Sequence, residues 1–189
     1  TSAKALNLAF EHGKFPGMEG LLSTYVMHLL NLEQYEFADR IFQIAKQVAD
    51  KNNGLKSEIW HFQSASVDLW VNTWEDSLQN YHITMAYCSE EGNQEYMGYA
   101  LDTLVNDILC KGEALISFEK EVEHVLVQLR RIQHYVMCTG IGMYRQFIKC
   151  IRGETLSASS FNDDQFSEDD YILPNLENSL LLAYIYGFK

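Results

Sequence analysis

The stretch EGNQEYMGYALDTLVNDILCKG, residues 91–112, contains the elements from which the rest of the chain is built. A Gly-Asn pair opens it, a run with helical periodicity follows, and a Lys-Gly pair closes it. The same order of opening, helix, short break and second helix recurs along the chain at a spacing of roughly forty residues. Because runs of this kind bury one face of each helix against a neighbour, the sequence predicts an all-α fold made of stacked helix pairs.

The apolar periodicity and the capping residues predict where the helices lie. Asn31 is expected to cap the third helix, with Gln34 three residues later, and Thr73 is expected to cap the fifth, with Asp76 three residues later. Gly142 and its neighbour Gly140 lie within the eighth helix and are small enough to let another helix approach closely. The nine expected helices cover about residues 3–12, 18–30, 32–51, 57–72, 74–91, 93–111, 114–132, 133–151 and 174–189.

The second helix of the first pair carries the small and aromatic residues that tetratricopeptide repeats place between helices. The residues with that spacing are Tyr35, Ala38, Phe42 and Ala45. The next pair keeps Ser77 and Tyr81, whereas the third keeps Ser117 but has Glu121 in place of an aromatic residue, so the motif decays. Two-helix repeats of roughly 34 to 47 residues stack into superhelices. We therefore predict a single helical-repeat domain over residues 1–189, a right-handed alpha-alpha superhelix of TPR-like helix pairs.

The composition limits the partners and the compartment. The 189 residues have a formal net charge of −12, which repels a phosphate backbone and an anionic membrane, so neither nucleic acid nor membrane is expected as a partner. No apolar run approaches the roughly 20 residues that span a bilayer, and we expect a cytoplasmic protein. We also expect the chain, which starts at Thr1, to be part of a longer protein. Four cysteines without CxxC spacing are expected to be buried free thiols, and they are Cys88, Cys110, Cys138 and Cys150.

Residues 153–170, GETLSASSFNDDQFSEDD, lack helical periodicity and are small, polar and acidic. We expect a floppy, solvated loop, longer than the usual connection between helices. Its acids lack the alternation and the central glycine of an EF-hand, so calcium binding is not expected. Phe161 and Phe166 within it are candidate docking residues for a partner, although such aromatics more often fold back onto their own domain. The acids considered as calcium ligands are Asp163, Asp164, Glu168, Asp169 and Asp170.

Two Glu-x-x-His pairs on separate helices suggest one enzymatic hypothesis, a di-iron carboxylate helical bundle. The pairs are Glu58 with His61 and Glu121 with His124. Helical spacing places the first pair on a polar stripe with Asp68, and the second pair lies on another polar stripe. Metal ligands in a bundle point into the core, so we expect both pairs to be solvated and predict neither a metal site nor a catalytic site.

Residues 90–104, EEGNQEYMGYALDTL, resemble a segment of the TPR-like helical-repeat region of large multidomain bacterial signalling ATPases. In that family a serine/threonine kinase-like domain and a P-loop ATPase precede the region, and sensor and histidine kinase domains often follow it. Residues 4–50, 70–78 and 181–189 are similar to other parts of the same region. The matching positions in the opening segment are Gly92, Asn93, Glu95, Tyr96, Gly98 and Ala100.

This resemblance implies a non-enzymatic protein-interaction and signal-relay scaffold. Its partners would be neighbouring domains of the same polypeptide and other proteins, in a two-component system with a histidine kinase. None of the family's catalytic motifs lies in these residues, so no cofactor is expected. Two alternatives remain open. One is an inducer-sensing superhelix of an ATPase-linked transcription activator, and the other is the di-iron enzyme.

Aromatic residues on the first helix of each pair would face the concave side, which helical repeats use for binding. Tyr25 and Tyr99 are the predicted partner-binding residues. Aromatics at helical spacing are more often core residues, so most of the chain's candidates for lining a peptide groove are expected to be buried. These candidates are Tyr25, Trp60, Trp70, Trp74, Tyr81, Tyr96 and Tyr99.

Overall fold

The computed structural model describes residues 2–188 except 14, 16 and 53, so residues 1 and 189 of the predicted domain lie outside the described part. The chain is all-α, as the periodicity predicts. It divides into two compact units, residues 1–101 and 102–189, and the boundary between them falls within α7. The handedness of a superhelix and the single domain stay predictions.

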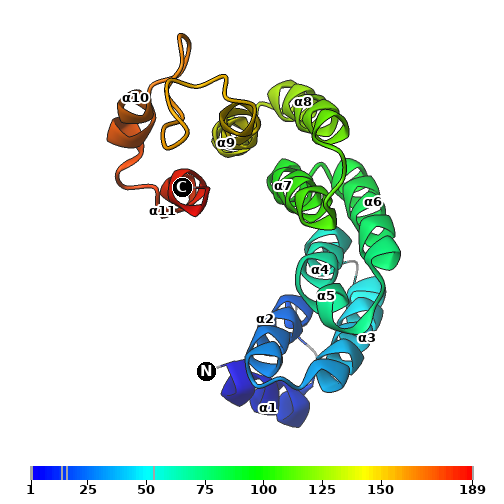
Figure 1. Cartoon of the computed structure of the whole chain (residues 1–189). Coiled ribbons are helices and arrows are strands. Elements are labelled where there is room, and N and C mark those ends of the chain that lie inside the picture. The colour runs from blue at the N-terminus through cyan, green and yellow to red at the C-terminus, as the bar shows by residue number, and fades with distance from the viewer. Residues whose placement is uncertain (1, 14, 16, 53, 189) are drawn as a thin grey trace. The chain divides into compact units, whose positions relative to one another are not determined.

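The elements are α1 (Ser2–His12), α2 (Met18–Asn31), α3 (Tyr35–Asn52), α4 (Lys56–Phe62), η1 (Gln63–Val67), α5 (Asp68–Val71), α6 (Trp74–Glu91), α7 (Gln94–Lys111), α8 (Leu115–Arg131), α9 (Tyr135–Ile151), α10 (Glu168–Ile172), η2 (Leu173–Asn175) and α11 (Ser179–Gly187) (Figure 1).

Helices of the first unit pack in pairs, α2 against α3 and α4 against α6 (Figure 1). In α3, Ala38, Phe42 and Ala45 are completely buried. The small alanines let two helices approach closely, and the phenyl ring fills the remaining space. Ser77 and Tyr81 are buried at the equivalent places in α6. The pattern that predicted helix pairs is therefore also the pattern that packs them.

One turn of π-helix, η1, interrupts the helix expected over residues 57–72. The carbonyl of Ser64 in this turn accepts hydrogen bonds from the Tyr81 hydroxyl (3.1 Å) and the Ser77 hydroxyl (3.3 Å) of α6. A π-turn adds a residue to the helix, so the residues after it are rotated away from the positions that an α-helical period assigns to them. The prediction that Asp68 lies on a solvated stripe is wrong for this reason, because its side chain is only 1% exposed.

Asp68 is held inside the first unit by amide donors from both sides of the π-turn and from α6. Its Oδ1 accepts from the Gln63 amide (3.0 Å) and the Asn72 amide (2.7 Å). Its Oδ2 accepts from the Asn80 amide at 2.6 Å. Buried carboxylates need such partners, because an unpaired polar group loses its hydration without compensation.

The corners between helices end on a residue with left-handed backbone. Glu33 and Gln133 both have a φ of 58°, and Gly92 has a φ of 66°. In each corner the N–H of the next residue donates to a carbonyl five residues earlier, as in the Schellman motif. Asn31 is consequently the last residue of α2, and the prediction that it caps α3 is wrong. A backbone turn, and not a side-chain cap, shapes this corner.

The predicted capping box at the start of α6 is confirmed. The backbone N–H of Asp76 donates to Thr73 Oγ1, and the backbone N–H of Thr73 donates to Asp76 Oδ2, both at 3.2 Å. Two N–H groups that the helix leaves without intrahelical acceptors are thus satisfied reciprocally.

In the second unit, α9 packs against both α8 and α11 (Figure 1). Gly140 of α9 lies directly beneath the ring of Tyr184 of α11, so a Cβ at this position would overlap the ring. The expected close approach at Gly140 is confirmed, whereas a Cβ on Gly142 would meet open space. The single helix expected from residue 174 is wrong, since α10 and η2 precede α11, whose N-terminus is capped by Asn178.

All four cysteines are free, but only Cys88 is buried. Cys110 is exposed, so the prediction of buried thiols is wrong for it, and Cys138 and Cys150 are half-buried. Among the helices described, none is both long enough and apolar enough to cross a bilayer.

Candidate functional site

Tyr99, one of the two predicted partner-binding residues, belongs to an aromatic cluster of the first unit. Its ring centroid lies 5.7 Å from that of Tyr96, at an interplanar angle of 88°, and 6.0 Å from that of His61 of α4. Its hydroxyl donates to Glu95 Oε1 at 2.9 Å. The ring is therefore fixed by contacts from α4 and from α7, and it keeps part of its surface exposed.

His61 of α4 packs among the other aromatic rings of this cluster. Its ring meets Tyr96 nearly edge-on, with centroids 5.5 Å apart, and contacts Phe62. Burial lowers its pKa to about 4, so the imidazole is neutral at physiological pH. Within the described residues, its buried Nδ1 has no hydrogen-bond partner. Burial, together with the nearby Glu58 carboxylate, also raises the pKa of Tyr96 above its usual range.

Tyr25 lies on α2, where it is half-buried against the core of the first unit. In the described part of the chain it makes no ring contact with His61 or Tyr96. The structure places Tyr25 on α2, the first helix of the α2–α3 pair, and Tyr99 on α7, and it does not bring Tyr25 into the cluster. Partner binding by either residue stays a prediction.

The expectation that most of the seven aromatic candidates are buried is wrong. Tyr81 alone among them is buried, and Trp70 is 58% exposed. The Trp70 ring stacks on Tyr35 of α3, with centroids 4.7 Å apart and an interplanar angle of 10°. A helical-repeat unit is thin, so a large ring on one helix can cover a neighbour and still leave its other face in solvent.

The two Glu-x-x-His pairs lie in different units. His61 is largely buried, so the expectation of a solvated pair is wrong for it, whereas Glu121 and His124 are exposed on α8 as expected. Across the described residues, no group of three His, Cys, Asp or Glu side chains is placed to hold a metal ion.

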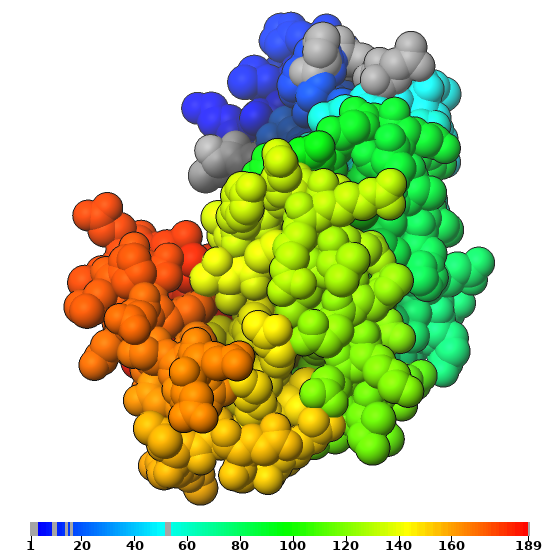
Figure 2. All heavy atoms as spheres, turned by 90° about the horizontal axis from the view of Figure 1, so that it is seen from above, coloured from blue at the N-terminus to red at the C-terminus, as the bar shows by residue number. Residues whose placement is uncertain are grey.

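The acidic segment between α9 and α10 is ordered by hydrogen bonds, so the prediction of a floppy loop is wrong. It forms part of the surface of the second unit (gold to orange in Figure 2). Phe161 folds back and is 3% exposed. Its backbone N–H donates to Glu168 Oε1 at 2.6 Å, and the Glu168 N–H donates to Asn162 Oδ1 at 2.6 Å. Two of the loop's polar side chains thus satisfy its own backbone.

Asp163 fastens the same loop to α9. Its Oδ2 accepts hydrogen bonds from Lys149 Nζ (2.6 Å) and Gln146 Nε2 (2.7 Å), and its Oδ1 accepts from the backbone N–H groups of Gln165 and Phe166. Burial alone would raise the pKa of this carboxyl, but the donors from Lys149, Gln165 and Gln146 together hold it below its usual value of 3.8. Asp163 is therefore ionised at physiological pH and serves as a structural anchor.

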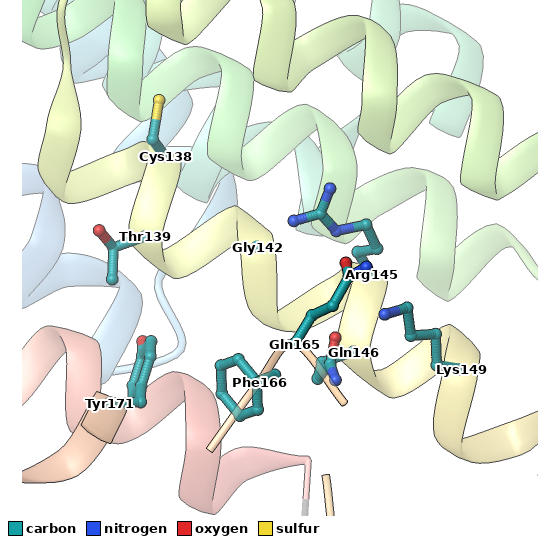
Figure 3. Close-up of a pocket in the computed structure, with 9 residues that line it drawn as sticks. All are labelled: Cys138, Thr139, Gly142, Arg145, Gln146, Lys149, Gln165, Phe166 and Tyr171. Atoms are coloured by element: carbon teal, nitrogen blue, oxygen red, sulfur yellow. The ribbon is translucent and has the colours of Figure 1, made fainter. Parts of the chain in front are cut away.

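A cavity of about 400 Å³ lies between α9 and this anchored loop. In Figure 3 the rings of Phe166 and Tyr171 face α9 across the cavity. Their centroids are 5.9 Å apart, and the Tyr171 hydroxyl donates to the Leu181 carbonyl at 3.0 Å, which fixes that ring. The lining residues are Cys138, Thr139, Gly142, Arg145, Gln146, Lys149, Gln165, Phe166 and Tyr171.

Sequence reasoning missed this cavity, although α9 contained a signal for it. Cys138, Gly142, Arg145 and Lys149 follow one another at helical spacing, so a glycine and two cations share one face of the helix. The opposite wall comes from a loop without periodicity, and no local pattern predicts that it returns to this face.

Comparison with protein-family models, with curated proteins and with solved structures found no match to this chain. Any functional conclusion therefore depends on the geometry described above and on the resemblance of residues 90–104.

Proposed function

We propose that this chain is a non-enzymatic interaction and signal-relay module of a multidomain signalling protein. Its first helices would bind a segment of a protein partner, which is either another domain of the same polypeptide or a separate protein. The resemblance of residues 90–104 to the helical region of bacterial signalling ATPases supports the relay role. No catalytic residue forms part of the proposal.

The position of Tyr99 is the observation that carries the binding role. Tyr96 and His61 pack against its ring and Glu95 accepts from its hydroxyl, so little side-chain entropy remains to be lost when a partner binds. A partly exposed, rigid tyrosine offers apolar area together with a polar end, and this combination is common at binding hot spots.

Selection of displayed random peptides on the intact chain tests this proposal. Peptides that bind should lose affinity by about tenfold or more when Tyr99 is replaced in Tyr99→Ala, as expected for a hot spot. Tyr135→Ala is the matched control, because it removes a tyrosine that is 70% exposed on α9. The proposal is wrong if no peptide is enriched, or if both variants weaken binding equally while far-UV circular dichroism shows both folded.

An inducer-sensing role is the second candidate, and the cavity beside α9 is the observation that favours it. A relay module needs an input, and a cavity of about 400 Å³ lies within the range of small-molecule sites.

Iron analysis of the purified protein addresses the remaining enzymatic hypothesis, since one or two equivalents of tightly bound iron would support the di-iron bundle.

A further inference from the structure

The cavity of the second unit has a glycine in its floor that close packing does not require. A Cβ on Gly142 would meet no atom within 4 Å, whereas a Cβ on Gly140, one half-turn earlier in α9, would overlap Tyr184. Glycine destabilises a helix interior relative to alanine. Among the contacts of α9 that the structure describes, none requires a glycine at this position, and the absence of a side chain enlarges the cavity.

Two cations lie on the same wall of the cavity, in a chain whose formal net charge is −12. Lys149 is committed to Asp163 at 2.6 Å, and this contact anchors the loop. Arg145 has a longer ion pair, with 3.4 Å between its Nη1 and Glu123 Oε1, and both side chains are 43% exposed. Because exposed ion pairs of this length are weak, the guanidinium of Arg145 is available to a competing carboxylate.

The opposite wall contains two fixed aromatic rings, beside the side chain of Gln165. Phe166 is positioned by the hydrogen bond from its backbone N–H to Asp163 Oδ1, at 2.8 Å, and Tyr171 is held through its hydroxyl. Figure 3 shows both rings on the side of the cavity away from Arg145. A ligand that fills this space therefore needs an anionic group at one end and a flat apolar group at the other.

We propose that this cavity binds a small aromatic carboxylic acid. Its carboxylate pairs with the guanidinium of Arg145, and its ring lies over Gly142 against Phe166 and Tyr171. A guanidinium can form two parallel hydrogen bonds with a carboxylate, which the ammonium group of a lysine cannot. Gln146 is excluded as a ligand group because it is buried and donates to the Phe161 carbonyl and to Asp163. The site lies in the second unit, so the proposal does not depend on partner binding at Tyr99.

Isothermal titration calorimetry of the whole chain with benzoate and 4-hydroxybenzoate tests the proposal. Acetate carries the charge without the ring, and benzamide carries the ring without the charge. We expect at least one of the two aromatic acids to bind with one-to-one stoichiometry and with a Kd of about 1 mM or less. Acetate and benzamide should bind at least about tenfold more weakly.

Two substitutions locate the site. Gly142→Leu fills the cavity from its floor, and Arg145→Gln removes the cation, so each should weaken binding of the aromatic acid by about tenfold or more. Arg152→Gln is the matched control, because Arg152 pairs with Glu119 and does not line the cavity. Gly142→Ala should keep the protein fully folded and still reduce affinity, which separates a filled cavity from a damaged fold.

Three results would overturn the proposal. The first is that neither aromatic acid binds. The second is that acetate or benzamide binds as tightly as the aromatic acids. The third is that Gly142→Leu and Arg145→Gln, both folded by circular dichroism, bind the acid as tightly as Arg152→Gln does.

Discussion

The buried imidazole of His61 predicts a specific loss of stability in mild acid. Burial lowers its pKa from 6.5 to about 4 in the folded chain. The unfolded chain therefore takes up the proton first as the pH falls, so the stabilisation is complete above pH 6.5 and disappears as the pH approaches 4. With these two values, the linkage relation gives a loss of about 2 kcal/mol in the free energy of unfolding between about pH 7.5 and about pH 5.

Urea unfolding followed by tryptophan fluorescence measures this loss of stability in the first unit, which contains His61. All three tryptophans, Trp60, Trp70 and Trp74, lie in the first unit with His61. The variant His61→Phe keeps an aromatic ring against Tyr96 but cannot be protonated. The other five of the six histidines and all carboxylates titrate alike in both proteins, so their contributions cancel in the difference.

The wild-type protein should lose about 2 kcal/mol more than His61→Phe over this pH interval. If both proteins lose the same amount, His61 is accessible to protons in the folded state, and the description of the cluster around Tyr99 as rigid and desolvated is refuted. If the wild-type protein gains stability in acid, the sign of the pKa shift is wrong.

Three further predictions concern corners, packing and the loop. Glu33→Gly should stabilise the first unit by about 0.5 to 1 kcal/mol in urea unfolding, since glycine adopts a positive φ without strain. Gly140→Ala should destabilise the second unit by about 1 to 3 kcal/mol, because the added methyl overlaps Tyr184, and faster hydrogen exchange in α9 would show it. Asp163→Asn should expose residues 153–167 to proteolysis at neutral pH. In the wild-type protein, the pKa of Asp163 lies below 3.8, so the loop should loosen only as the pH falls below that value.

Much of the helical architecture follows from local sequence. The ends of α6 are set by the capping box at Thr73 and by Gly92, and both signals lie within a few residues of the ends they define. Ala38, Phe42 and Ala45 predicted a packed helix pair because their spacing alone places them on one face. Helix position and core membership are therefore readable where the deciding contacts are close in sequence.

The predictions from sequence were wrong where contacts between residues distant in sequence decide the structure. The loop was expected to be solvated because its composition is polar, but Asp163 is anchored by Gln146, 17 residues away. The burial of Asp68 depends on a π-turn that shifts the helical phase and on an amide donor from Asn80 in another helix. Hydrophobic periodicity cannot predict such a shift, because it assumes the same rotation about the helix axis for every residue.

The candidate site was predicted only in part, because contacts between residues distant in sequence complete it. Local periodicity predicted the helix that carries Tyr99, but the contact of its ring with His61 joins residues of different helices. Only one wall of the cavity could be predicted from the sequence, because Gly142, Arg145 and Lys149 share one face of a helix. The aromatic rings of the other wall belong to the loop and to α10, and no local pattern places them there.

A relay module must show energetic coupling between its two sites, and this requirement connects the two proposals. Suppose that an aromatic acid in the cavity changes the affinity of the aromatic cluster around Tyr99 for a peptide by some factor. The bound peptide must then change the affinity of the cavity for the acid by the same factor. A coupling of 1 to 3 kcal/mol, about 5- to 150-fold, is typical of allosteric proteins. Titrating a selected peptide with and without saturating benzoate, and benzoate with and without the peptide, measures both sides of this equality. Arg145→Gln should abolish the coupling but leave peptide affinity in the absence of benzoate unchanged. Equal peptide affinity with and without bound benzoate would refute the relay between these sites, even if both ligands bind.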